Sequence, residues 1–219
     1  MKLSKIAFWL FISFFKLDIA AQIGIQVSGM NHLLNPNTTS KHLQAEALKA
    51  GDLGISYGLR LKTVRIEMHP VLSLAYGTGD FLDSDLAFSE MGAAFNLPIL
   101  FYLLDFADDC NCPTFNKQGE VFEKGLYILI QPGINHVWTS LKNLDEAPDY
   151  KGFLPEIGLG LGFDFGLSRQ TTLSAFVVLS RTFNGHYEFD ELLKTWEKSA
   201  AHMNLQLGFR YLWYSKRIR

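Results

Sequence analysis

The chain has little cysteine, no excess of basic residues and a modest share of charged residues. Its 219 residues include 2 cysteines, too few for a disulfide framework. Lysine and arginine number 20 against 22 aspartates and glutamates, so the charge balance indicates no nucleic-acid partner. Charged residues make up 19% and aromatic residues 14%, which excludes a disordered chain. The length fits one ordinary domain or a small pair, and 18 phenylalanines stand beside 18 glycines, an unusual mixture for a core rich in bulky rings.

Long apolar runs are also missing beyond Gln22. The nearest candidate, 92–104, contains Asn96 and Pro98 and is shorter than the roughly 20 residues of a helical membrane span, so helical spans are excluded. The sequence contains no glycine-rich phosphate loop, zinc-binding helix motif or nucleotide fingerprint. We therefore expect no cofactor.

The first residues have the three parts of a secretory signal peptide. Lys2 and Lys5 precede an apolar run over 6–15, and small residues close the segment at Ala21. The run is about half the length of a bilayer span, which disfavours the alternative of an anchor helix. We predict a cleaved signal peptide over 1–21, a barrel domain over 22–214 and a C-terminal overhang over 215–219.

Apolar and polar residues alternate along the mature chain with a period of two, as in β-strands. In 201–214, Leu207, Phe209 and Trp213 share one face and Gln206 lies on the other. The polar face of 153–167 carries four glycines, each costing a helix about 1 kcal/mol relative to alanine, so a strand is favoured there too. The pattern predicts eight strands, the other six being roughly 23–28, 53–61, 64–74, 86–104, 125–139 and 171–183.

The predicted connections alternate in length, which is typical of an antiparallel up-and-down transmembrane β-barrel. The segments 40–51 and 188–200 contain good helix formers, and we expect short helices there. The segment 105–124 is long where a short turn is expected. The other long connections are 31–50, 77–85, 140–152 and 184–200, and the short ones are 62–63 and 168–170.

Alternation alone also fits a soluble, lipocalin-like barrel whose apolar face points inward to bind a ligand. The polar face is rich in glycine, serine, asparagine and glutamine, which suits the narrow lumen of an eight-stranded barrel. Eight apolar residues on one face of 153–167 represent more than about 10 kcal/mol of burial, at roughly 1.5–3 kcal/mol each. We therefore expect the apolar face to meet lipid. Aromatic residues should form an inner belt of Phe101, Tyr102, Tyr211, Trp213 and Tyr214 and an outer belt of Tyr76, Trp138, Phe183 and Tyr187.

The last predicted strand fits the closing-strand signal of bacterial outer-membrane proteins, through Gln206, Gly208, Tyr211 and Trp213. With the signal peptide, the eight strands and the stretch 96–102, the chain resembles the PorT-like outer-membrane β-barrel family. The resemblance spans essentially the whole mature chain. It implies a Gram-negative outer-membrane location, contact with outer-membrane lipid and recognition by the barrel assembly machinery. A minority of the family is linked to type IX secretion and gliding, and most members have no established activity.

Charged residues of the polar face should pair across the lumen, because a lone buried charge costs several kcal/mol. We interpret them as a structural plug, and a narrow ion or proton path is the alternative. The predicted lumen charge network comprises Arg60, Arg65, Glu67, His69, Glu156, Asp164, His202 and Arg210, with Lys62 beside it.

Cys110 and Cys112 lie in the long segment 105–124. In the oxidising periplasm this pair would close a small disulfide that clamps the turn. A redox or metal site with Asp108 and Asp109 is the alternative, although a Cys-x-Cys pair is a weak zinc signal.

An enzyme that modifies lipid A remains the main alternative function. The chain offers Ser40 near His42 and His186 near Glu188, but neither spacing resembles the pattern of the lipid A deacylases. We predict a non-enzymatic protein with a structural or interaction role. Its extracellular loops or its long periplasmic turn would contact an extracellular or periplasmic protein partner.

Overall fold

The computed structural model describes residues 22–33, 43–60, 66–81, 87–103, 125–142, 149–168, 170–183, 188–190, 195–197 and 202–214. None of these ranges forms a helix long and apolar enough to cross a membrane. The strands in the described ranges are β1 (Gln22–Leu33), β2 (Leu43–Arg60), β3 (Ile66–Met68), β4 (Val71–Phe81), β5 (Ala87–Asn96), β6 (Ile99–Tyr102), β7 (Leu126–Lys142), β8 (Tyr150–Gly166), β9 (Thr171–Thr182), β10 (Glu188–Asp190), β11 (Thr195–Glu197) and β12 (His202–Tyr214).

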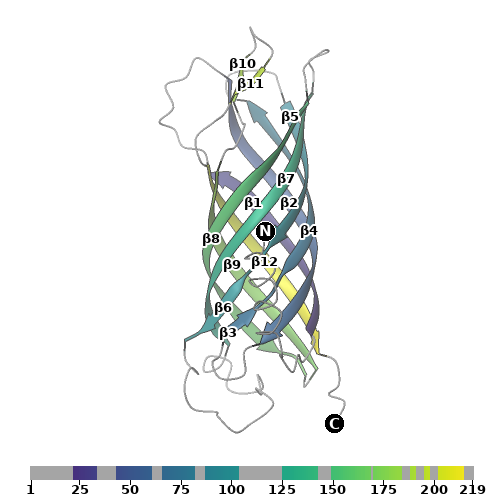
Figure 1. The fold of residues 1–219 in the computed structure, drawn as a ribbon, viewed down its shortest axis with the longest axis vertical. Helices are drawn as coiled ribbons and strands as arrows, with labels where there is room; N and C mark the ends of the chain where they lie inside the picture. The colour runs from purple at the N-terminus through teal and green to yellow at the C-terminus, as the bar shows by residue number, and fades with distance from the viewer. Residues whose placement is uncertain are drawn as a thin grey trace, which may run out of the picture.

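The long strands form one closed antiparallel ring (Figure 1). β1 pairs with β12 on one side and with β2 on the other, so the first and last strands close the wall. β3 and β4 both pair with β2 and occupy one place in the ring, and β5 and β6 share another beside β7. The described part of the chain is therefore an eight-stranded up-and-down transmembrane β-barrel, and β10 and β11 lie at the end that we name the upper rim.

Two prolines divide the third and fourth wall strands. Pro70 separates β3 from β4, and Pro98 separates β5 from β6, because proline has no N–H to donate to the ladder. The register continues through both breaks. Tyr57 donates its backbone N–H to the Pro70 carbonyl at 3.0 Å, and His69 donates to the Pro98 carbonyl at 2.8 Å.

The register fixes the shape of the barrel. A path that follows residues paired straight across, strand by strand, starts at Gln22 and returns to β1 at His32, ten residues farther along. With the usual distance between strands and the usual rise per residue, this offset corresponds to a tilt of about 40° between the eight strands and the barrel axis. A barrel of this size has an interior that side chains can fill.

The two faces of the wall differ as the alternation predicts. Along β12, Leu207 and Phe209 are 58% and 60% exposed, whereas Arg210 is 1% exposed. An apolar outer face meets lipid and not water, which contradicts the soluble, lipocalin-like alternative. Every wall position contributes exposed apolar side chains, including Ile25, Leu53, Leu74, Met91, Ile134, Leu159, Leu179 and Leu207.

The two expected loop helices are wrong. β2 already begins at Leu43, and the segment 188–200 contributes the short strands β10 and β11. β1 pairs with β2 only as far as Lys49, and beyond that residue β10 pairs with Leu43 and Gln44 on β2. Backbone hydrogen bonds to an otherwise vacant strand edge outweigh the modest helix propensity of these segments.

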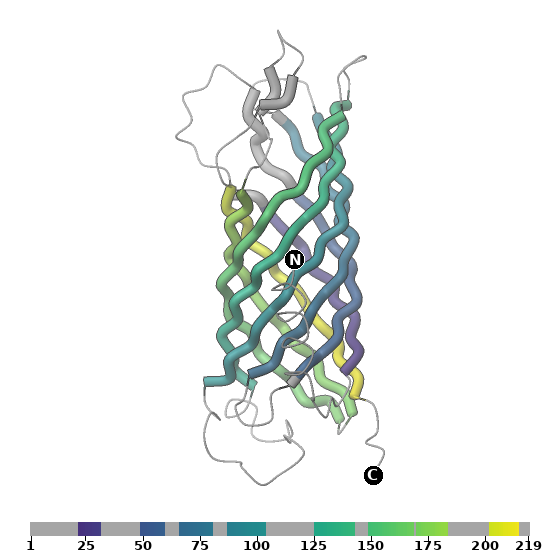
Figure 2. The backbone as a smooth tube through the Cα atoms, viewed as in Figure 1, coloured from purple at the N-terminus to yellow at the C-terminus, as the bar shows by residue number. Residues whose placement is uncertain are grey.

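The wall is taller on one side. β8 pairs with β9 only from Glu156 onward, so residues 150–155 of β8 and the paired part of β7 extend farther toward the upper rim than β9 and β12 (Figure 2). We name this extension, residues 136–142 and 150–155, the β7–β8 arm.

Candidate functional site: a filled lumen

The half of the lumen away from the upper rim is sealed by apolar side chains. Tyr102 and Tyr127 meet edge to face, with ring centroids 5.5 Å apart. This buried cluster, which we name the lower plug, consists of Leu100, Tyr102, Tyr127, Leu129, Phe176 and Val178. The cluster draws its side chains from β6, β7 and β9.

Arg210 enters the lower plug from β12. Its Nε and Nη2 atoms donate to Oε1 of Gln26 at 3.1 and 2.9 Å, and its guanidinium lies 5.5 Å from the ring centroid of Phe176. Asp164 and Glu67 are the carboxylates whose charges act on it. The cation is thus held by an amide and a ring, and the two carboxylates contribute at longer range.

The carboxylates of Asp164 and Glu67 each contact a nearby side chain. Asp164 accepts hydrogen bonds from the hydroxyl of Tyr102 at 2.6 Å and from the hydroxyl of Ser174. Glu67 lies 3.1 Å from Nε2 of His69, two residues along the same wall strand. Burial without such partners would be costly, so these contacts stabilise charges inside the wall.

The upper half of the lumen is polar and acidic. Asn135 and Thr182 donate to Oε2 of Glu156 at 3.1 and 3.3 Å, and Thr139 donates to Glu90 at 3.2 Å. The hydroxyl of Ser28 donates to Asp52. A cavity of about 50 Å³ lies among these acids and is large enough for a few water molecules. No three potential metal ligands gather within the described residues.

One hydrogen bond spans the lumen between strands that are not neighbours. Gln131 on β7 donates through Nε2 to Oε1 of Gln206 on β12 at 3.2 Å. Gln206 in turn donates to the hydroxyl of Ser28 at 2.7 Å. These three residues and Asp52 form a hydrogen-bonded bridge from β7 through β12 and β1 to β2.

The structure places the described members of the predicted charge network inside the barrel. Arg60 lies at the end of β2 with its side chain outside the description, and Arg65 lies outside the described residues altogether. Hydroxyl and amide groups are among the partners of these charges, as Asn135 and Thr182 are for Glu156 and Gln26 is for Arg210. The six buried members are Glu67, His69, Glu156, Asp164, His202 and Arg210.

Sequence reasoning missed Asp52 and Glu90. Asp52 lay just before the second predicted strand, which was expected to begin at residue 53, whereas it belongs to β2 and accepts a hydrogen bond from Ser28. Glu90 lies in 86–104, where alternation is irregular. The polar or small residues at 52, 54, 56 and 58 would have revealed Asp52 as a lumen position.

The predicted assembly signal divides between the two faces of β12. Gln206 and Gly208 face the lumen, and Tyr211 and Trp213 face outward at 45% and 59% exposure. The inner aromatic belt is wrong at Tyr102, which is buried in the lower plug. Tyr214 is half-buried, and its hydroxyl lies 3.1 Å from that of Thr172.

Several other predicted site residues lie outside the described residues. They are Cys110 and Cys112, with Asp108 and Asp109 beside them, and Ser40, His42 and His186 from the enzyme alternative; the side chain of Glu188 is also not described.

A closed ring of eight tilted strands, an apolar outer wall and a polar, filled lumen define a small β-barrel of the bacterial outer membrane, and this chain lies in that membrane. The crystal structure of a major outer membrane protein from Thermus thermophilus has this fold. Its sequence is 11% identical, and the match covers 89% of this chain and 100% of the Thermus thermophilus chain, with a TM-score of 0.51. The likeness concerns the fold alone.

Two further solved structures match less closely in three dimensions. Neisserial surface protein A is 8% identical over 90% of this chain and 97% of its own, with a TM-score of 0.47. The outer membrane protease OmpT from Escherichia coli is 7% identical in sequence. The match covers 91% of this chain and 98% of OmpT, with a TM-score of 0.41. No protein-family profile and no curated protein sequence matches the chain.

Proposed function

We propose that this protein is a closed, non-enzymatic outer-membrane barrel that serves as a membrane-anchored interaction scaffold. The bridge from Gln131 to Gln206 carries the proposal, because it crosses the lumen above the lower plug. A lumen closed at two levels leaves little room for transport of a solute. The functional surface is then the part that rises out of the membrane.

The β7–β8 arm is the surface best placed to bind an extracellular protein. The Phe183 N–H donates to the Pro155 carbonyl at 2.8 Å, and this is the last backbone contact between β8 and β9. Beyond it, the backbone groups of Lys151 and Phe153 that face the β9 side have no strand partner within the described residues. Such an edge can add an extended segment of a partner.

Assignment to the PorT-like family, and recognition of β12 by the barrel assembly machinery, belong to the same proposal. Tyr211 and Trp213 project outward near the end of the last strand, where an assembly factor would meet them. The long segment 105–124 would face the periplasm and offer a second surface to a protein there.

Site-specific photo-crosslinking in cells tests the scaffold role. A photo-reactive amino acid at Lys151 should yield a protein adduct, whereas the same group at the lipid-facing Leu207 should yield lipid adducts alone. Lipid adducts alone at both positions would contradict an interaction role for the arm.

Mass spectrometry of lipid A from cells with and without the protein tests its non-enzymatic character. We expect the same acyl pattern in both. A changed pattern would assign it to the lipid A-modifying alternative.

A further inference from the structure

Two glycines on the lipid-facing side of the wall stand directly opposite each other, Gly29 on β1 and Gly51 on β2. A Cβ at Gly29 would meet no atom within 4 Å, and one at Gly51 would meet only the Ser28 carbonyl oxygen at 3.7 Å. Neither glycine has a left-handed φ. Internal packing and backbone geometry therefore require glycine at neither position, although glycine weakens a strand.

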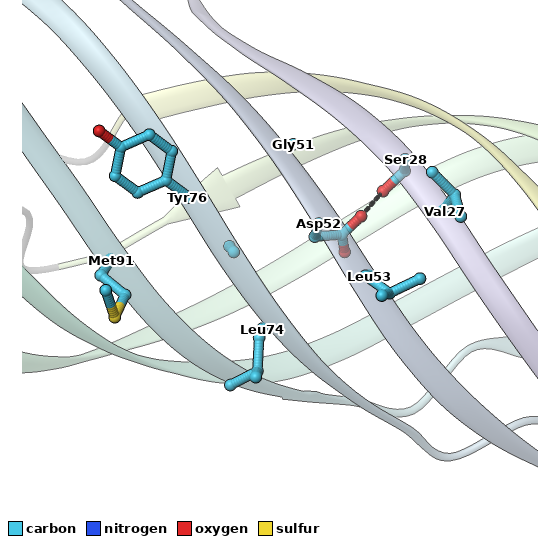
Figure 3. Close-up of a pocket in the computed structure, with 9 residues that line it drawn as sticks. Val27, Ser28, Gly51, Asp52, Leu53, Leu74, Tyr76 and Met91 are labelled. Atoms are coloured by element: carbon cyan, nitrogen blue, oxygen red, sulfur yellow. Dashed lines mark hydrogen bonds between the residues drawn. The ribbon is translucent and has the colours of Figure 1, made fainter.

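Gly51 borders a hollow in the outer wall. A cavity of about 470 Å³ opens outward beside Gly51, and Figure 3 shows apolar side chains around it. Its lining comprises five large side chains on the exposed face of the barrel, Val27, Leu53, Leu74, Tyr76 and Met91, together with Gly51, Ala75 and the hydrogen-bonded pair Ser28 and Asp52.

The hollow belongs to the leaflet nearer the upper rim. Gly51 pairs straight across with Tyr76, Tyr76 with Met91, and Met91 with Trp138. Outward-facing tyrosine and tryptophan favour the headgroup level of a bilayer, so the hollow begins beside that level and extends toward Leu53 and Val27 in the hydrocarbon.

We propose that this hollow, which we name the lipid groove, holds one acyl chain of an outer-leaflet lipid. The groove is continuous with the apolar wall that the bilayer already covers. Its outward-facing side chains are apolar apart from the hydroxyl of Tyr76, and the two polar side chains Ser28 and Asp52 that also border it hydrogen-bond to each other. A void facing hydrocarbon is filled by hydrocarbon, because its lining would otherwise lose its contacts. Glycine at 51 keeps this space open, since a larger side chain there would occupy the volume of the acyl chain.

Photo-crosslinking to a labelled lipid tests the groove. The full mature chain is reconstituted in phosphatidylcholine nanodiscs in which some lipids carry a photo-reactive group on the acyl chain, and adducts are mapped by mass spectrometry. We expect several-fold more adduct on Leu53 and Leu74 than on Ile157 and Leu179, which face lipid on another part of the wall.

The variant Gly51→Leu fills the groove at a position with free space, so the barrel should still fold, as circular dichroism will show. The excess of adducts on Leu53 and Leu74 should disappear in this variant. Ala175→Leu, which adds an isobutyl-sized side chain of the same final size to the outward face of β9, should preserve the excess. Even labelling around the wall, or an excess that survives Gly51→Leu, would overturn the proposal.

Discussion

Gln131 and Gln206 join β7 to β12 through a 3.2 Å hydrogen bond across the middle of the barrel. The bond connects wall strands that two others separate, so it limits the opening of the lumen more directly than a contact between neighbours would. Its continuation from Gln206 to Ser28 and Asp52 anchors it to two further strands. Amide and hydroxyl groups thus link opposite sides of the barrel wall at its middle level.

The bridge should be measurable as a coupling free energy. In a double-mutant cycle with Gln131→Ala and Gln206→Ala, we expect a coupling of about 1 kcal/mol, because both amides are buried. Urea unfolding in detergent micelles, followed by tryptophan fluorescence, gives the free energies of unfolding of the wild type, the two single variants and the double variant. The cycle of Ser168→Ala with Thr171→Ala, an exposed pair with hydroxyls 2.7 Å apart, should give nearly none. Equal couplings for the two pairs would count against the bridge.

Arg210 should be the most sensitive charged residue of the lumen. Arg210→Met keeps the length of the side chain but removes both donors to Gln26 and the charge that faces Asp164 and Glu67. We expect a loss of about 3 kcal/mol in the free energy of unfolding, since the two acids lose their counter-charge. The matched variant Arg181→Met, on the outward face of β9, should change stability by less than about 1 kcal/mol. The two losses are compared by urea unfolding, and similar values would exclude a stabilising role for the lumen arginine.

Glycines facing the lumen should tolerate a side chain less well than glycines facing lipid. A Cβ at Gly162 would overlap the ring of Tyr127 in the lower plug. We expect Gly162→Val to destabilise the barrel by about 2 kcal/mol through overpacking, whereas Gly51→Val, which enters open space, should be neutral or stabilising. The urea concentrations at the midpoint of unfolding compare the stabilities of the two variants. A Gly51→Val variant as unstable as Gly162→Val would reverse the assignment of faces.

The cysteine pair stays a prediction that chemistry can test directly. If Cys110 and Cys112 form the expected disulfide, a maleimide reagent should label neither thiol in protein purified from the cell envelope. Both should react after reduction. Labelling of both thiols before reduction would reject the turn clamp.

The fold was predictable where one face of a strand is apolar and the other is not. Residues 202–214 meet this condition, and β12 follows the expected bounds closely. The upper half of β2 does not, because its Ala and Lys residues favour a helix in isolation. It becomes a strand through pairing with β4 and β10, which are distant in sequence.

The lumen was harder to predict than the wall. Ile99, Leu100, Phe101 and Tyr102 are all apolar or aromatic, so alternation disappears and Tyr102 was assigned to the wrong face. The charges were expected to pair with one another, but the hydroxyl of Ser174, which donates to Asp164, and the amide oxygen of Gln26, which accepts from Arg210, are among their partners. Such partners depend on the register between strands, which composition does not encode.

Contacts of leucine methyl groups in lipid nanodiscs test the central claim most directly, because they need no substitution. With methyl-labelled leucine, nuclear Overhauser effects to lipid chains should appear for the outward-facing Leu159, Leu179 and Leu207. The buried Leu100, Leu129 and Leu212 should show effects neither to lipid chains nor to water. Lipid contacts at Leu100 and Leu129, or water in place of lipid at Leu159 and Leu207, would contradict an apolar wall around a closed lumen.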